Sequence, residues 1–270
     1  MNISLMNVNN KQLPTNRQQG FTIVELLIAG VLGLLLLAGV VQLFVGSNKN
    51  YSLQGQLADI QEDGRFALMF LKEELQQGGW AENPWANRPG AINMANSSDG
   101  VTDSVAVAYS VAAGGVNSFD CNGSAVATGQ IENRFFVGGA NGDELLCQGN
   151  GGGAAQPLIN GVTNFQVLYG VESDAACPDG VINGYLTHDQ FVAAGASVLL
   201  VSVRVALLLS SEEDVLPADE SKDHQLLDTS VNTNDKLAHR LFQQTIYMPN
   251  GIFLTISDPS SVMDCMTDLI

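Results

Sequence analysis

The hydrophobic pattern begins with one long apolar run. From Phe21 to Val45 the only charged residue is Glu25. A helix that rises about 1.5 Å per residue would reach about 37 Å over this run, enough to cross the hydrocarbon core of a bilayer. A buried core helix is the competing interpretation, but core helices seldom stay apolar on every side for so long. The pattern therefore predicts a membrane-spanning helix over residues 21–45.

After Val45 the apolar positions fall on one side of a helix. They recur at steps of three and four residues, at Leu53, Leu57, Ile60, Gly64, Ala67, Leu68, Leu71 and Leu75. This spacing is typical of a helix that packs one face on a core. No Pro lies between Pro14 and Pro84, and Gly78-Gly79 provides the stop. We expect one continuous helix from about Phe21 to about Gln77, with residues 46–78 as its amphipathic half.

Beyond Gly79 the periodicity becomes that of strands. Apolar and polar residues alternate between turn clusters rich in Gly, which is the pattern of half-buried strands. The candidate strands cover residues 104–111, 132–138, 144–147, 162–171, 198–209 and 243–255, the last with a turn near Pro249-Asn250-Gly251. We expect an α+β fold in which residues 79–270 form a mostly antiparallel sheet laid on the second half of the long helix.

The net charge limits the possible function classes, and the distribution of charge predicts the orientation of the chain in the membrane. The formal charge of −17 argues against nucleic-acid binding, which needs Lys and Arg against the phosphates. Residues 1–20 carry Lys11 and Arg17 and no acid, which leaves −17 − (+2) = −19 for the rest. They lack the apolar region of an ordinary secretory signal. Positive residues ahead of a span stay cytoplasmic, so the C-terminal bulk is expected outside.

Glu25 is the residue that the apolar run does not explain. Near the start of a helix its simplest role is an acid favoured by the helix dipole. Its surroundings, Gly20-Phe21-Thr22-Ile23-Val24-Glu25, resemble the cleavage and methylation motif of type IV prepilins and pseudopilins. The resemblance implies that residues 1–20 are a leader, that prepilin peptidase cuts between Gly20 and Phe21 and methylates Phe21, and that Glu25 pairs with a neighbouring subunit's terminal amine. Such a pair would set the register of subunits in the filament.

Further segments resemble one branch of that superfamily, the PilW family. These are residues 59–68, Phe70-Leu71, Gly78-Gly79-Trp80, 156–159, 161–171 and 203–209. The resemblance implies a minor pilin that helps to start pilus assembly at or near the tip. Its implied partners are other minor pilins, the major pilin and the inner-membrane assembly platform, with the head in the periplasm. A minor pseudopilin of a type II secretion system and a tip adhesin remain as alternatives.

The four cysteines are Cys121, Cys147, Cys177 and Cys265, and their spacings fit no common zinc pattern. In an exported head, two disulfides are the natural interpretation. Four cysteines allow three pairings. Members of the family often carry cysteines around the first two positions, so the resemblance implies Cys121–Cys147, which leaves Cys177–Cys265 by exclusion.

No catalytic or metal constellation emerges from the sequence. His188, His224 and His239 have no metal-like partner at helical spacing, and we expect His239 in a surface or capping role. The acidic stretch Ser211–Asp235 is predicted to be a solvated loop. Calcium binding there stays open as an alternative, although its acids lack the rhythm of a known calcium loop, as does the acidic turn around residues 172–180. We therefore predict no enzyme activity, no cofactor and no metal.

Overall fold

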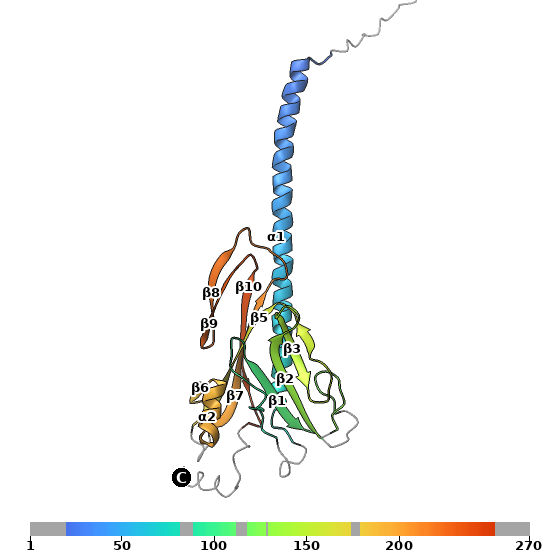
Figure 1. Cartoon of the computed structure of the whole chain (residues 1–270). Helices are drawn as coiled ribbons and strands as arrows, with labels where there is room; N and C mark the ends of the chain where they lie inside the picture. The colour runs from blue at the N-terminus through green and yellow to red at the C-terminus, as the bar shows by residue number, and fades with distance from the viewer. Residues whose placement is uncertain (1–19, 82–88, 112–117, 128, 174–178, 252–270) are drawn as a thin grey trace, which may run out of the picture. The chain divides into compact units, whose positions relative to one another are not determined.

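A computed structural model of the chain describes residues 20–81, 89–111, 118–127, 129–173 and 179–251 (Figure 1). The chain divides into two compact units, Met1–Asn50 and Tyr51–Ile270. Helix α1 (Ile23–Gln77) contributes residues to both units. The expectation of one continuous helix from about residue 21 to about residue 77 is therefore confirmed.

The described part of the first unit is residues 20–50, all of them exposed. They include the apolar half of α1, whose most apolar window has a mean hydropathy of 2.6 and is 0% buried. By length and composition this helix is able to cross a membrane. The buried-core interpretation finds no support in this segment, because all of its described residues are exposed.

In the second unit, α1 buries the predicted stripe. Ile60, Gly64, Ala67, Leu71 and Leu75 are buried. Leu57 and Leu68 are partly buried against the same core, and Leu53 is half-buried. The helix ends at Gln77, and Gly79 follows in a left-handed conformation with φ 76°, which glycine adopts without strain. The 3.6-residue period thus identified the face that packs on the head.

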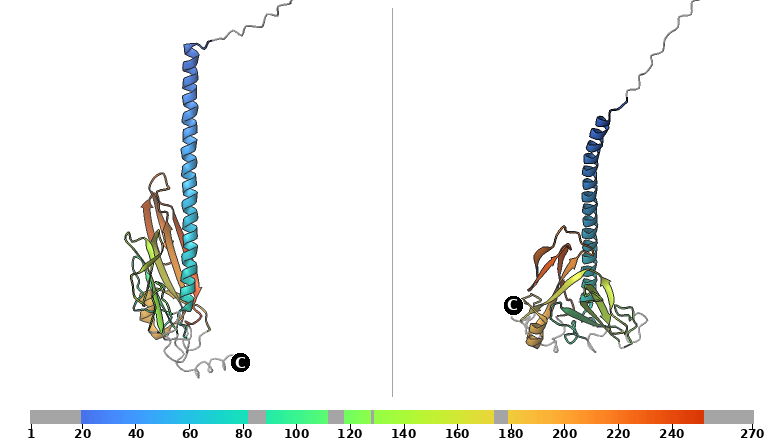
Figure 2. Two further views of the ribbon diagram at one scale, coloured as in Figure 1. Left: turned by 90° about the vertical axis from the view of Figure 1, so that its right-hand side faces the viewer. Right: turned by 45° about the horizontal axis from the view of Figure 1, so that its top comes forward.

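Two antiparallel sheets supply the rest of the core. The first has the order β1 (Ser104–Ser110), β2 (Gln130–Gly138), β3 (Glu144–Gly149) and β4 (Gln156–Ile159). The second has the order β10 (His239–Tyr247), β7 (Leu199–Ser210), β5 (Val162–Glu172) and β6 (Gly184–Leu186). All of these pairs are antiparallel. Within this unit the two sheets flank the lower part of α1 (Figure 2), and their apolar residues join its stripe in one hydrophobic cluster.

The expected loop over Ser211–Asp235 is wrong. This stretch contains a two-stranded hairpin, β8 (Glu220–Leu226) and β9 (Thr229–Asp235). Leu226 holds the hairpin on the second sheet, where it packs with Ala206 and Leu208, and all three are fully buried. A single buried Leu in this polar segment therefore determines which face of the hairpin packs on the sheet.

A short helix, α2 (His188–Ala194), and a 3₁₀ turn (Gly195–Ser197) precede β7 and were not expected. Thr187 caps α2 in a capping box with Gln190. The expected strand over residues 243–255 is confirmed only as far as Tyr247. Its turn is present, because Gly251 N–H donates to the carbonyl of Met248, and residues 252–255 lie outside the described part.

Candidate functional site

The first candidate site is the junction at Gly20-Phe21. Thr22 stands directly before α1, and its hydroxyl accepts a hydrogen bond of 3.2 Å from the backbone N–H of Glu25. Thr22 also supplies the carbonyl for the Leu26 N–H at 3.1 Å. This is the geometry of an N-cap, which satisfies backbone donors that a helix leaves open at its first turn. The helix therefore begins two residues after the Gly20-Phe21 peptide bond.

Glu25 lies in the first turn of α1, and its side chain is exposed. A carboxylate at this end of a helix is favoured by the helix dipole. The next charged residue along the chain is Lys49, so Glu25 is the only formal charge in the apolar half of the helix. Exposure leaves this carboxylate available to a group from another molecule.

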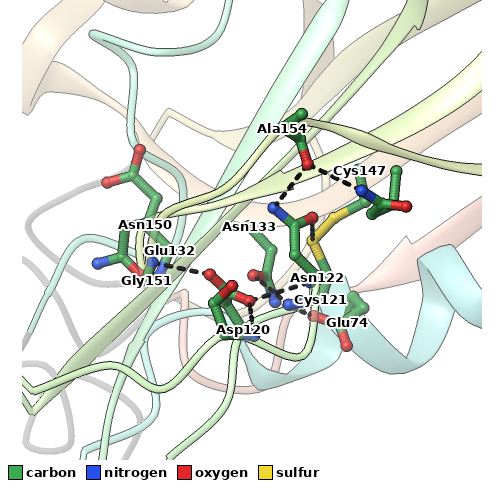
Figure 3. Close-up of a disulfide and its surroundings, with 12 residues drawn as sticks. Glu74, Asp120, Cys121, Asn122, Glu132, Asn133, Cys147, Asn150, Gly151 and Ala154 are labelled. Atoms are coloured by element: carbon green, nitrogen blue, oxygen red, sulfur yellow. Dashed lines mark hydrogen bonds between the residues drawn. A yellow bond between two sulfur atoms is a disulfide. The ribbon is translucent and has the colours of Figure 1, made fainter.

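The second candidate site is a disulfide in the head, drawn in Figure 3. Cys121 and Cys147 are bonded, with their Cα atoms 6.3 Å apart and a separation of 26 positions in the sequence. Cys147 lies in β3 and is fully buried. This confirms the predicted Cys121–Cys147 pair. Cys177 and Cys265 lie outside the described residues, so their pairing stays a prediction.

Asp120, next to the disulfide, organises the loops around it. Its carboxylate accepts N–H groups from Asn122 at 3.0 Å, Ser124 at 2.9 Å and Gly151 at 2.7 Å. Gly149 lies so close to Asp120 that an added Cβ would meet its carboxylate. Three N–H donors satisfy a carboxylate that is only 5% exposed. The glycine-rich segment after β3 is therefore fixed to the Cys121 loop by hydrogen bonds (Figure 3).

Asn133, in β2, joins this loop to the helix. Its Oδ1 accepts the N–H of Cys121 at 3.0 Å, and its Nδ2 donates to Oε2 of Glu74 at 2.7 Å. Asn133 is 1% exposed, so both bonds lie in the interior. Burial raises the pKa of the Glu74 carboxyl, and the bond from Asn133 opposes that rise. These contacts make the disulfide loop a structural element, with no sign of reactive chemistry.

The acidic segments hold no metal site in the part of the chain that the structure describes, where no three His, Cys, Asp or Glu side chains gather. Glu172 instead accepts the N–H groups of Asp179 and Gly180. The expectation of a surface position for His239 is wrong. Its side chain is only 6% exposed and pairs with Asp235 at 3.0 Å. Desolvation lowers the pKa of neighbouring His224. The hairpin β8–β9 brings Asp235 next to β10, which the sequence spacing did not indicate.

Two families match the sequence. The prokaryotic N-terminal methylation motif matches residues 15–41, which include the junction and the first part of α1. The family described as type IV pilus-assembly protein W (PilW) matches residues 134–250, which run from β2 to the end of β10. The two matches together support a type IV pilin of the PilW family.

Among solved structures, the chain matches a type IV-like pilin from Thermus thermophilus. It is 14% identical, with a TM-score of 0.46, and the alignment covers 71% of this chain and 97% of that one. No curated protein sequence matches.

The two family matches support a pilin's role in pilus assembly, and the apolar helix supports membrane anchoring. Pilins are structural subunits that assemble with other pilins on a membrane platform. This structural role agrees with the architecture of the head, in which buried polar side chains hold the loops in place.

Sequence reasoning located the helix stripe and one disulfide, and the junction stays a prediction. It missed Asp120, Asn133 and Glu74, because each forms at least one hydrogen bond to a residue distant in sequence. Asp120 and Gly151 are 31 residues apart, and Asn133 and Glu74 are 59 residues apart. The Asp-Cys-Asn order around Cys121 is too common to signal a braced loop. The capping box Thr187–Gln190 was a signal for α2 that could have been used.

Proposed function

We propose that this PilW-family chain is a minor pilin that takes part in starting type IV pilus assembly, at or near the tip. Prepilin peptidase would cut between Gly20 and Phe21 and methylate Phe21. The observation that carries the proposal is the coincidence of the methylation motif with the start of a capped, apolar helix. The junction precedes the first helical residue, Ile23, by only two residues, so a cut there would leave a nearly fully helical stem.

The proposed location is the inner membrane, with residues 21–45 spanning it and residues 79–270 in the periplasm. Lys11 and Arg17 on the leader favour a cytoplasmic N-terminus. The Cys121–Cys147 disulfide supports an oxidising compartment for the head, because such bonds are rare in the cytosol. After cleavage the protein would leave the membrane and enter the pilus.

Glu25 is proposed to pair with the terminal amine that cleavage creates on Phe21 of a neighbouring subunit. Each charge alone is costly in an apolar helix bundle, and the pair offsets part of that cost. The exposed carboxylate in the first turn of α1 is compatible with such a contact.

The minor, tip-proximal position is inferred from size. A head of this size with long glycine-rich loops would crowd a filament if every subunit carried it, and fits better at an end. The proposed partners are other minor pilins, the major pilin and the inner-membrane assembly platform. The PilW match over residues 134–250 favours the pilus over a type II secretion pseudopilus.

The test is the mature N-terminus, read by mass spectrometry from cells with and without prepilin peptidase. We expect a chain that starts with methylated Phe21 only when the peptidase is present. Deletion of the gene should reduce surface pili and leave type II secretion intact. An intact leader in peptidase-positive cells, or normal piliation with impaired secretion, would refute the proposal.

A further inference from the structure

Strand β10 is the edge of the second sheet in the part of the chain that the structure describes, where β7 is its only strand neighbour. Met248 N–H donates to Val201 O, and Ser211 N–H donates to Ala238 O, so even-numbered residues of this segment form the hydrogen-bonded pairs with β7. In an antiparallel pair the alternate residues point their N–H and C=O groups away. Leu241, Gln243, Thr245 and Tyr247 therefore present backbone donors and acceptors at the free edge.

This edge lacks the features that protect exposed strands. Natural edges are blunted by Lys, Pro, inward charges or bulges. Between Leu241 and Tyr247 the strand has no charge, no Pro and a regular register with β7. No described residue outside β7 hydrogen-bonds to the backbone of this stretch. An unprotected, β-prone edge is a surface on which another strand can pair.

Beside the edge lies an arginine that has no acidic partner among the described residues. Arg204 of β7 pairs directly with Thr245 and donates from Nε to its hydroxyl at 3.1 Å. Its guanidinium carbon lies 3.8 Å from the centre of the Tyr185 ring. Of the carboxylates that the structure describes, none forms an ion pair with it, although the chain has 28 acids and 11 Lys and Arg. Thr245 and Tyr185 hold the guanidinium in place, and no described residue hydrogen-bonds to its terminal nitrogens.

The open groups of the edge and of Arg204 meet in one hollow. A depression of ≈ 330 Å³ is lined by Arg204 and by three consecutive residues of β10, Gln243, Gln244 and Thr245. On the same face, Tyr247 is 50% exposed. A fork of N–H donors is suited to a carboxylate, which it binds through two parallel hydrogen bonds. Backbone groups repeating every second residue match an extended polypeptide and favour it over a sugar or a free anion.

We propose that the β10 edge binds an extended segment of another pilus subunit by strand addition, with an Asp or Glu of that segment on Arg204. The new strand would pair with the odd-numbered residues of β10 and lay its acid over the face that carries Arg204. That the segment comes from a pilus subunit rests on the proposed function; the strand pairing and the acid rest on β10 and Arg204 alone.

The test places the photo-crosslinker p-benzoylphenylalanine at Tyr247 of the full-length chain in piliated cells and identifies the linked peptide by mass spectrometry. We expect a peptide that contains Asp or Glu from another pilus subunit. Arg204→Gln should lower its yield about tenfold, the size expected for a lost charge-assisted hydrogen bond. Arg134→Gln is the matched control, because Arg134 also lies over an aromatic ring, that of Phe136, but in the other sheet.

Two proline variants distinguish loss of strand pairing at the free edge from loss of the folded head. Gln243→Pro removes an outward N–H and should abolish the crosslink while the head stays folded. Gln244→Pro removes an N–H that bonds to β7 and should destabilise the head, as seen in proteolysis. No crosslink, or one to residues 252–270 of the same chain, to a second copy or to any other protein, overturns the inference. So does a wild-type yield in both Arg204→Gln and Gln243→Pro.

The same strains distinguish failure of the proposed function from failure of the strand-addition inference. If the leader is uncleaved or deletion leaves piliation unchanged, the proposed function fails whatever the crosslink shows. If processing and piliation behave as proposed but the edge variants crosslink as wild type, only the strand-addition inference fails.

Discussion

Gly64 of α1 lies directly beneath the ring of Phe242 in β10. A Cβ placed on Gly64 would stand 2.5 Å from Phe242 Cε2, well inside any normal contact. Glycine therefore permits the helix to approach the second sheet at this point. The sequence placed Gly64 on the apolar stripe, but only the structure gives the reason that this position is small.

Replacing Gly64 with Ala should destabilise the head by about 1–3 kcal/mol, because the Phe242 ring has to move out of a packed core. The unfolding free energy of the head in the full-length protein, in detergent, measures this. Gly55→Ala is the matched control: nothing lies within 4 Å of its Cβ position, so Ala should stabilise the helix by about 0.5–1 kcal/mol. Phe242→Leu should recover part of the loss in a double variant. Equal effects at both glycines would contradict this account.

The disulfide should stabilise the head chiefly through the loop that it closes. Cys121→Ser with Cys147→Ser should cost about 3 kcal/mol by the chain-entropy estimate. It should also raise hydrogen exchange at the Gly151 amide, because Asp120 holds that N–H only while the Cys121 loop stays in place. Asn133→Ala should raise exchange at the Cys121 amide with the disulfide intact. Unchanged exchange at Gly151 in the double serine variant would show that the loop does not depend on the bond.

Asp103 should make the head less stable as pH rises. It lies before β1, is 5% exposed and accepts N–H groups from Val167 at 2.8 Å and Gly100 at 3.0 Å. Desolvation outweighs these bonds and raises its pKa to about 6. The folded state therefore binds this proton more tightly than the unfolded chain. The contribution of the protonated carboxyl to the unfolding free energy is present below about pH 4 and is lost as pH rises through 6.

The measurement is the unfolding free energy of wild type and Asp103→Asn between pH 4 and 7. The wild-type value minus the variant value should fall over this range, by on the order of 2 kcal/mol. Asn cannot ionise, but it offers only one oxygen to two N–H donors, so the variant should be the weaker protein at pH 4. A difference that rises with pH would mean that the backbone donors prevail over desolvation.

How far the sequence could predict the fold depended on how regular each pattern was. The stripe from Leu57 to Leu75 and the alternation of β7 follow directly from helical and strand periods, so α1 and β7 were located within one or two residues. The β8–β9 hairpin escaped because Leu226 is its only fully buried residue. Its two-residue turn, Leu227-Asp228, also lacks the usual Asn-Gly signal, although Leu227 has a positive φ of 51°.

The candidate sites also differ in how far the sequence could predict them. Gly20, Phe21 and Glu25 stand in a local motif, so sequence alone could propose them. Arg204 could not be recognised in this way. Its setting depends on Tyr185 from β6 and Thr245 from β10, and on the lack of an ion pair with any described acid, all of which arise only when the sheet is assembled.

The remaining prediction concerns Glu25. Glu25→Val should leave cleavage after Gly20 unchanged, since the junction itself is intact, and should reduce incorporation into pili by about tenfold or more, because the terminal amine of the neighbouring subunit loses its counter-charge in an apolar bundle. Mass spectrometry of the membrane-bound chain reads cleavage, and immunoblots of sheared pili against membranes read incorporation. Gln42→Val, which also replaces a polar side chain of the apolar half with Val, is the control and should enter pili normally. Wild-type incorporation of Glu25→Val would rule out amine pairing as the step that sets register, and failure of both variants would point instead to the polarity of the helix as a whole.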